Sequence, residues 1–360
     1  MAAEDNKSIV VITGAAGNIG QSIATELRNE HTIVGLDVEG KKADFPLIDV
    51  DLSSGQSVNT ALEKIRETYG DKIAAVIHLA AYFDFTGEDN PLYTEVNVDG
   101  TRNLLRALQN FEVERFIYSG TMLVHEAGKP GEIIDEGKPI NPKWAYPQSK
   151  ADAEAVIKAE SGKIPYLLLH LAGLYDDESA VPTLAHQIAR IYGRDLKSRL
   201  YAGDLKAGQS LLHKNDLVRL FRLAVEKRHM LVPDAVILAG ETEAVSYEEL
   251  QNLIGSLIHG KEEWTTLSMP KPLAKAGAWV EEKAEPIIPD AIDGGEKPFI
   301  RPFMVDMADD HYALDISRAN DQLGWRPRHS IRDTLPKIVN SLKADPEAWY
   351  ERHGITLENE

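Results

Sequence analysis

The chain has 360 residues, of which 43% are hydrophobic and 27% are charged, the balance of an ordinary globular protein. Aspartate and glutamate number 57 against 39 lysines and arginines, and the formal charge of -18 argues against nucleic acid or membrane partners. No cysteine is present, which excludes disulfides and thiolate chemistry. The longest apolar run, residues 73–83, is too short for a membrane span, and no signal-peptide core is evident, so we expect a soluble cytoplasmic protein.

The first half of the chain alternates short apolar runs with helical patterns. The predicted strands are 8–13, 31–37, 45–48, 74–79, 115–119 and 166–171. The predicted helices are 19–29, 57–68, 96–109 and 147–160. Continuous apolar strands separated by amphipathic helices are typical of a parallel sheet covered on both faces. The pattern therefore predicts a doubly wound, Rossmann-type α/β fold, whose ligands lie at the carboxyl ends of the strands.

The regular alternation ends after Tyr175. Later predicted helices are 184–192, 215–226, 246–257, 272–282 and 335–342, with one more strand at 235–238. The helix and strand within 211–240 return to the sheet, so we assign 1–175 plus 211–240 to the Rossmann domain. Residues 176–210 plus 241–345 are assigned to a smaller, mostly helical C-terminal substrate lobe, and 346–360 to a C-terminal tail.

A glycine-rich segment joins the first predicted strand to the first helix. The cofactor-binding residues predicted there are Gly14, Gly17, Asn18, Ile19 and Gly20. Glycines at this spacing let backbone N–H groups and the helix amino terminus approach a pyrophosphate. Asp37 closes the next strand, where a carboxylate accepts the adenosine ribose hydroxyls and favours NAD over NADP. Lys41 and Lys42 would soften that preference, and the alternative is a structural glycine turn beside a chance acidic residue.

Further cofactor contacts are predicted where later strands end. Asp51 and Leu52 follow the third strand and would hold the adenine, although helix capping is an equal alternative for Asp51. Small side chains after the fourth strand leave space for the cofactor. The residues predicted to line that space are Leu79, Ala80 and Ala81. His78, in the same strand, is expected to be a satisfied core histidine.

Tyr146 and Lys150 place a phenol and an ammonium four residues apart at a helix start. Pro147 suits the first helical turn, and the spacing puts both side chains on one face. A lysine cation beside the phenol stabilises phenolate and lowers its pKa toward the range of a general base. Alone, such a pair often lies on a solvent-exposed helix face without a function. Following a dinucleotide-binding motif in the same chain, it indicates an enzyme.

Together these motifs resemble the extended short-chain dehydrogenase/reductase family, often called the NAD-dependent epimerase/dehydratase family. The matching pieces, in family order, are 13–20, 76–81, 97–101, 119–121, Tyr146 with Lys150, 213–217, 315–319 and 323–327. The resemblance implies that Tyr146 is the acid/base, that Lys150 binds the nicotinamide ribose, and that Thr121, replacing the usual serine, holds the substrate oxygen. It implies that Asn97 anchors the helix and a water supporting this site, with helix capping as the alternative.

Departures from the family pattern bear on the substrate. Sugar 4,6-dehydratases carry an Asp-Glu pair where this chain has Met122 and Leu123, so dehydration by that mechanism is not expected. Gln209 stands where nucleotide-sugar epimerases carry a diphosphate-binding arginine, and His170 begins the segment that replaces a usual Arg-Pro pair. Arg301 resembles a second diphosphate-binding arginine, or is an ordinary surface residue.

Three aromatic residues follow the fourth strand: Tyr82, Phe83 and Phe85. They would form an aromatic wall beside the substrate, or pack their own loop. The stretch 270–285 is similar to 3β-hydroxysteroid dehydrogenase-like members of the family and would cover an apolar substrate.

The resulting prediction is an NAD-dependent epimerase that acts on a nucleotide-linked sugar through transient hydride transfer from a substrate hydroxyl carbon. One alternative is an NAD-dependent dehydrogenase/reductase of a sterol-like or flavonoid-like alcohol, and another is an inactive dinucleotide sensor. The resemblance also implies a homodimer, paired through the helices at 96–109 and 147–160. No metal is expected.

Overall fold

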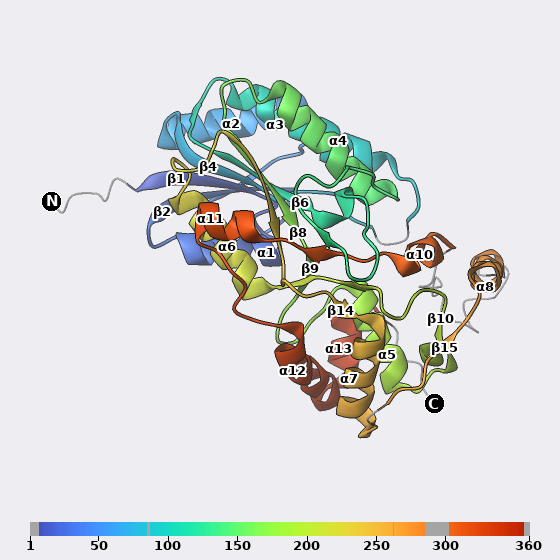
Figure 1. Ribbon diagram of the computed structural model, residues 1–360. Helices are drawn as coiled ribbons and strands as arrows, with labels where there is room; N and C mark the ends of the chain where they lie inside the picture. The colour runs from blue at the N-terminus through green and yellow to red at the C-terminus, as the bar shows by residue number, and fades with distance from the viewer. Residues whose placement is uncertain (1–6, 85–86, 262, 285–301, 356–360) are drawn as a thin grey trace.

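The computed structural model describes residues 7–84, 87–261, 263–284 and 302–355. A parallel sheet crosses the larger domain, with helices on both faces and a smaller helical lobe below it (Figure 1). The strand order is β3-β2-β1-β4-β6-β8-β13, and β5 pairs with one end of β4. This order confirms the predicted doubly wound, Rossmann-type fold. Strands β2 and β3 extend the sheet on one side of β1, and β4 and the later strands extend it on the other. At such a switch point the carboxyl ends of β1 and β4 leave a crevice suited to a ligand.

The strands of the sheet lie close to the predicted runs. They are β1 Ser8–Thr13, β2 His31–Asp37, β3 Leu47–Asp49, β4 Lys72–His78, β5 Glu112–Val113, β6 Phe116–Thr121, β8 Tyr166–Leu171 and β13 Asp234–Ala239. The third strand was expected at 45–48 but begins at Leu47. Pro46 precedes it, and a proline has no N–H group to donate to the neighbouring strand.

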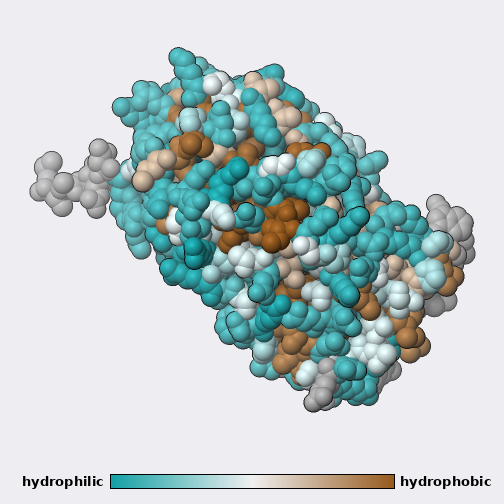
Figure 2. Space-filling view, in the orientation of Figure 1, coloured by the Kyte–Doolittle hydropathy of each residue, from teal (hydrophilic) through white to brown (hydrophobic). Residues whose placement is uncertain are grey.

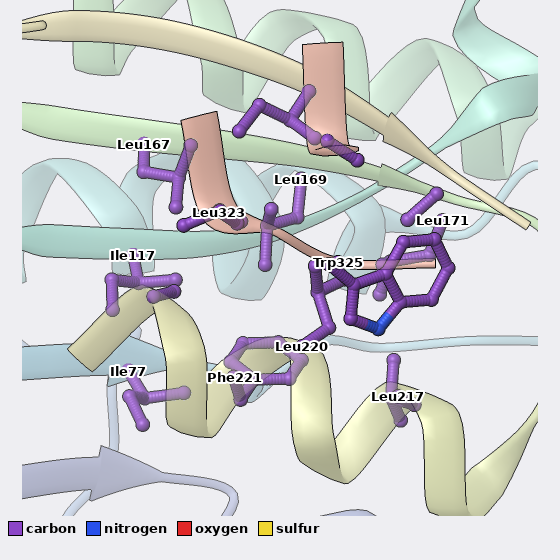
Figure 3. Packing of buried hydrophobic residues seen from close by; sticks show 14 of the residues in the cluster. Ile77, Ile117, Leu167, Leu169, Leu171, Leu217, Leu220, Phe221, Leu323 and Trp325 are labelled. Atoms are coloured by element: carbon purple, nitrogen blue, oxygen red, sulfur yellow. The ribbon is translucent and has the colours of Figure 1, made fainter. Parts of the chain in front are cut away.

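Two layers of helices cover the sheet. One face carries α2 Gly55–Tyr69, α3 Gly100–Leu108 and α4 Ala145–Glu160, and the other carries α1 Asn18–Leu27, α6 Lys214–Glu226 and α11 Ser317–Leu323. Successive residues of β4 alternate between the layers, so Val76 packs on the α2–α3 side and Ile77 on the α6 side. Figure 3 shows the second layer, where Phe221 of α6 and the fully buried Trp325 lie against the sheet.

The helix expected at 96–109 has two parts. Residues Tyr93–Asp99 form η1, a π-helical segment, and α3 continues from Gly100. The wider turn places the buried Asn97 side chain toward the loop after β4, where it hydrogen-bonds the backbone of Tyr82. Segments of this kind are frequent at functional sites, and the apolar periodicity of the sequence does not reveal them.

The smaller lobe is built from four helices that share one apolar cluster: α5 Pro182–Tyr192, α7 Tyr247–His259, α12 Ile331–Ala344 and α13 Pro346–Arg352. The sequence interpretation placed 346–360 in a tail, but 346–352 is helical and Trp349 is fully buried. Asp345 caps α13 and Pro346 occupies its first turn, which is a recognisable start signal. The indole and Tyr350 therefore belong to the core of the lobe.

The remaining elements are short. The strand pairs are β7 Ile133–Ile134 with β16 Ala313–Leu314, β9 Gly173–Tyr175 with β12 Leu211–His213, β10 Leu200–Tyr201 with β15 Leu267–Ser268, and β11 Gly208–Gln209 with β14 Val245–Ser246. The short helices are η2 Met122–Val124, η3 Leu196–Arg199, α10 Pro302–Asp306 and η5 Met307–Asp309, and the longer α8 is Lys271–Ala284. Figure 2 shows a mostly hydrophilic face with an apolar patch near its centre. None of the described helices is long and apolar enough to cross a membrane.

Candidate active site

The glycine-rich turn between β1 and α1 fits a dinucleotide. Gly14 has φ +67°, a left-handed conformation, and a Cβ there would lie 3.0 Å from the backbone nitrogen of Ala80. A Cβ on Gly20 would lie 2.4 Å from the carbonyl oxygen of Gly14, so α1 and the turn touch because both residues are glycine. Gly17 caps α1, and Asn18 and Ile19 form its first turn, which has no acidic residue and no side-chain cap. The free helix terminus therefore suits an anion.

Asp37 ends β2 beside this turn. Its Oδ2 atom accepts a hydrogen bond from the backbone N–H of Ala16 at 2.8 Å, and Oδ1 accepts one from Val38 at 2.8 Å. The half-buried carboxylate is thus fixed against the glycine-rich turn, where it suits the hydroxyls of an adenosine ribose. Lys41 and Lys42 are exposed.

The other predicted cofactor residues line the ends of neighbouring strands. The Oδ1 atom of Asp51 accepts hydrogen bonds from the backbone and hydroxyl of Ser53, while α2 is capped by Ser54. Leu52 is buried. The N–H of Leu79 donates to the carbonyl of Thr13, and the N–H of Ala80 donates to the Thr13 hydroxyl. Ala81 comes next and is half-buried.

His78 is a satisfied core residue, as the sequence predicted. The Thr13 hydroxyl lies 2.7 Å from its Nδ1 atom and the Thr101 hydroxyl lies 3.0 Å from its Nε2 atom. Burial, aided by the charge of Lys150, lowers the pKa of His78 to about 3. The ring therefore stays neutral and ties β1, β4 and α3 together.

The predicted catalytic residues lie where α4 packs on the end of β6. Tyr146 is in the first turn of α4, and Lys150 follows one turn later on the same face. The Nζ atom of Lys150 lies 4.4 Å from the ring centroid of Tyr118, which belongs to β6. Thr121, the last residue of β6, is buried, and its hydroxyl accepts a hydrogen bond from the N–H of Leu123 at 3.3 Å.

The electrostatics of this pair differ from the sequence expectation. Burial raises the pKa of Tyr146 to about 12, and the nearby Tyr93 hydroxyl acts in the same direction. Burial lowers the pKa of Lys150 to about 8, against the opposing effect of Glu154. The expected lowering of the Tyr146 pKa by Lys150 is thus not found, because desolvation raises that pKa instead.

Asn97 connects the catalytic helix to the loop after β4. Its amide nitrogen donates to the Ser149 hydroxyl at 2.9 Å and to the carbonyl of Tyr82 at 3.0 Å. The Ser149 hydroxyl donates in turn to the carbonyl of Tyr146 at 2.8 Å. Asn97 lies inside the π-helical segment, so the helix-capping alternative is wrong, and its side chain positions the first turn of α4.

An aromatic cluster surrounds Tyr146. The ring of Phe83, which is 49% exposed, lies 4.7 Å from the Tyr146 ring in an edge-on arrangement. Trp144 lies 5.6 Å from Tyr146 and 5.6 Å from Phe303 of α10. Tyr82 instead packs on Tyr93 and accepts a hydrogen bond from the amide of Asn90, as loop packing would require. Phe85 lies outside the described residues.

Sequence reasoning missed two members of this cluster. Trp144 stands two residues before Tyr146, so its closeness in sequence could have indicated it. Phe303 is distant in sequence and contacts Trp144 only in the folded chain.

Of the two predicted diphosphate contacts, the structure describes only one. Gln209 is an exposed residue of β11, and Arg301 lies outside the described residues. A polar opening of about 430 Å³ lies beside the glycine-rich turn, at Asn18. Its lining includes Asn18, Asp176, Lys214, Arg352 and His353. Lys214 forms an ion pair with Asp176 at 2.7 Å, and sequence reasoning assigned no site role to either residue. In the part of the chain that the structure describes, no group of three or more His, Cys, Asp or Glu side chains could hold a metal ion.

A dinucleotide-binding turn after the first strand and a Tyr-Lys pair at the start of α4 together indicate an NAD-dependent enzyme with a Rossmann-type fold. Residues 10–239 match the model of the NAD dependent epimerase/dehydratase family, so the chain belongs to that family. It is an enzyme of the extended short-chain dehydrogenase/reductase type, and the cofactor of this family is NAD.

Relatives with named activities cover different shares of the chain. UDP-glucuronate 4-epimerase of Thermodesulfobacterium geofontis is 30% identical over 369 residues, which cover 94% of this chain and 97% of the relative. A decarboxylating sterol-4-alpha-carboxylate 3-dehydrogenase of Schizosaccharomyces pombe is 35% identical over 126 residues, 34% of this chain and 36% of the relative. The structure of MoeE5 in complex with UDP-glucose and NAD is 21% identical with a TM-score of 0.67, covering 94% of this chain and 100% of that one.

Proposed function

We propose that this enzyme is an epimerase of a nucleotide-linked sugar. The observation that carries the proposal is the set of groups at the end of β6. Thr121 ends β6, and α4, which carries Tyr146 and Lys150, packs against that strand. The next two side chains after Thr121, Met122 and Leu123, cannot transfer a proton. The site is therefore equipped to remove and return one hydroxyl proton but not to expel water. The full-length similarity to a UDP-glucuronate 4-epimerase supports the same conclusion.

The proposed chemistry uses the chain's own groups at the substrate oxygen. Tyr146 takes the proton of a ring hydroxyl and gives it back after the carbon has been inverted. The Thr121 hydroxyl holds the same oxygen, and the Lys150 ammonium favours the phenolate while that proton is away. When bound, NAD supplies a hydride acceptor that also serves as the donor. The residues that would hold it are the glycine-rich turn, Asp37 and Lys150.

Substrate recognition is proposed on the aromatic side of Tyr146. Phe83 is exposed next to the catalytic phenol, so a sugar ring can lie on its face. Gln209 and Arg301 are proposed contacts of the diphosphate. A neutral glutamine in place of an arginine makes one charge-assisted contact to the diphosphate fewer. Substrate recognition would therefore depend more on the sugar ring and the nucleotide.

The test is to incubate the purified protein with NAD and a panel of UDP-sugars, including UDP-glucuronate and UDP-glucose. Products are separated while absorbance of NADH is followed. A changed sugar epimer without net NADH supports the proposal. No epimer from any sugar of the panel would contradict it.

A second candidate is a dehydrogenase of an apolar secondary alcohol. The aromatic cluster of Phe83, Trp144 and Phe303 favours it, because such a surface also suits a fused hydrocarbon ring. The partial similarity to a sterol dehydrogenase points the same way. In the same assay, NADH accumulating in step with an oxidised apolar alcohol would establish this reading.

We also infer a homodimer paired through α3 and α4. The outer surface of these helices carries a charged group: the Glu160 carboxylate lies 2.8 Å from Nε of Arg102 and 2.9 Å from Nε of Arg106. Light scattering at micromolar concentration should give twice the mass of the chain, and a single monomeric mass would count against pairing. A cytoplasmic location stays a prediction of the sequence.

A further inference from the structure

An ammonium group of α4 lies over the face of an aromatic ring of β6. The Nζ atom of Lys150 is 4.4 Å from the ring centroid of Tyr118, and the two residues are 2% and 1% exposed. Within the residues that the structure describes, this Nζ atom forms no hydrogen bond and no ion pair. Because a buried charge is costly without compensation, the ring face is the direct contact that offsets the burial of Lys150.

The sheet fixes the position of this ring. Tyr118 lies within β6, where it pairs in register with His78 of β4 on one side and with Leu168 of β8 on the other. Its side chain belongs to the apolar cluster that packs between the sheet and the helices α2, α3 and α4. A ring enclosed in this way has little freedom to turn, so it is a rigid support for the side chain of Lys150.

The hydroxyl group of Tyr118 does not account for this arrangement. It is buried, and among the described residues it has no hydrogen-bond partner. An unsatisfied hydroxyl in a protein interior costs stability. Burial, together with the charge of Glu154, raises the pKa of this phenol well above its usual value, so the ring remains uncharged. What Tyr118 offers Lys150 is therefore the electron-rich face of a neutral ring.

A ring face and a carboxylate would affect the ammonium differently. An ammonium carries three N–H donors, and a carboxylate in contact with it would accept hydrogen bonds from them and offset its charge. A ring attracts the cation through its quadrupole and needs no lone-pair acceptor. The charge of Lys150 and its donors thus stay available for oxygen atoms of a ligand, such as ribose hydroxyls.

From this contact we propose that Tyr118 is a positioning residue for Lys150: its ring holds the ammonium in place and favours its charged form without occupying its N–H donors. The inference deepens the proposed function and rests on it in one respect, namely that Lys150 works as a cation beside Tyr146. Tyr118 is enclosed in the core, so it acts only through Lys150.

Other ionisable groups surround Lys150. Tyr146 and Glu154 belong to α4 itself, and Tyr93 comes from η1, which packs against that helix. His78 of β4 stays neutral, because burial lowers its pKa to about 3. All four groups are retained when Tyr118 is substituted, so a difference between variants reports on the ring.

Two substitutions separate the ring face from the hydroxyl. Tyr118→Phe removes only the hydroxyl, so Lys150 should behave as in the wild-type protein. Tyr118→Leu keeps an apolar side chain and removes the ring face. Phe116→Leu is the matched control, because Phe116 is a fully buried aromatic residue of the same strand and the same apolar cluster, whereas Lys150 lies over Tyr118.

The experiment observes Lys150 directly by NMR, in the 360-residue chain labelled with carbon-13 at the lysine ε carbons. The signal that disappears in Lys150→Met is the signal of Lys150. A ring shields the nuclei that lie over its face. The ε protons of Lys150 should therefore resonate upfield of those of exposed lysines in the wild-type protein, in Tyr118→Phe and in Phe116→Leu. In Tyr118→Leu this upfield shift should be lost.

The same signal reports the protonation state of Lys150. Burial lowers the pKa of Lys150 to about 8, so a titration from about pH 6 to about pH 11 covers the transition. Because the ring stabilises the cation, Tyr118→Leu should move the midpoint down by about one pH unit, which leaves about tenfold fewer charged Lys150 side chains at a fixed alkaline pH. Tyr118→Phe and Phe116→Leu should keep the wild-type midpoint. A merely structural role of Tyr118 would not distinguish the two leucine variants.

A wild-type Lys150 signal without an upfield shift would overturn the proposal. So would a Tyr118→Phe variant that behaves like Tyr118→Leu, or equal midpoints in the two leucine variants. If Tyr118→Leu does not fold, the wild-type shift and its retention in Tyr118→Phe decide. The signal is recorded without substrate and does not depend on turnover. A failure of the sugar-epimerase proposal would therefore leave this test intact, and a failure here would leave that proposal intact.

Discussion

The cofactor side and the substrate side of this site are built in different ways. The cofactor side is local in sequence: the glycine-rich turn and Asp37 lie within 24 residues and are held by backbone contacts such as the Ala16 N–H to Asp37 hydrogen bond. The proposed substrate side gathers Phe83, Trp144 and Phe303 from three separate segments. A fixed cofactor requires fixed backbone geometry, whereas a substrate is selected by side chains that can differ from one member of the family to another.

Tyr146→Phe should have the largest effect, because the proposed mechanism needs this phenol to act between the cofactor and the substrate. Removing the hydroxyl removes the acid/base, so turnover should fall by about 10²–10⁴-fold. The dissociation constant of NAD should stay within about twofold, since the glycine-rich turn is untouched. Stopped assays of product and calorimetry of NAD binding check the two expectations. Unchanged turnover would refute the mechanism.

Gly20→Ala should break the cofactor side alone. A Cβ at this position would lie 2.4 Å from the Gly14 carbonyl, so the turn must move away from α1. We expect NAD affinity to fall by about 100-fold or more, the size of a lost phosphate cradle. Gly277→Ala is the matched control, because nothing lies within 4 Å of a Cβ there. Equal NAD affinity in the two variants would contradict the assigned role of the turn.

Asp37→Asn should alter the choice of cofactor. The amide cannot accept both ribose hydroxyls and no longer repels a 2′-phosphate. The preference for NAD over NADP should shrink by about tenfold, the loss of one charge-assisted contact of about 1.5 kcal/mol. Competition binding with both dinucleotides measures this ratio. A preference equal to that of the wild-type protein would place the ribose elsewhere.

Phe83→Ala should show the smallest effect and only on the substrate side. Losing one exposed aromatic face should raise KM by about five- to tenfold, on the scale of about 1 kcal/mol. NAD affinity should not change, because Phe83 contacts Trp144 and Tyr146 but not the glycine-rich turn. A raised dissociation constant for NAD with an unchanged KM would contradict the assignment of Phe83 to the substrate side.

The same contrast explains what the sequence could predict. Apolar runs and the glycine spacing predict the sheet, its order of elements and the family, because each of these features is local and periodic. Periodicity cannot reveal η1, whose wider turn places Asn97 against the backbone of Tyr82. It also missed α13, since a short helix is stabilised by the lobe core that Trp349 joins.

The contacts around the catalytic helix are long-range. Phe303 is 157 residues beyond Tyr146 and meets Trp144 only in the folded chain. His170 was visible as a departure from the family pattern, but its partners Glu154 and His125 come from other elements. The desolvation that raises the pKa of Tyr146 likewise follows from packing, which the Tyr-Lys spacing does not convey.

The most direct test of the central claim is to run the reaction on a UDP-sugar substrate in deuterium oxide and to locate deuterium in the product epimer by NMR. Inversion through Tyr146 acting on the hydroxyl leaves the carbon-bound hydrogen within the enzyme, so the inverted carbon should carry no solvent deuterium. Deuterium at the inverted carbon would mean proton abstraction from carbon, and it would contradict the role given to Tyr146 and its partners.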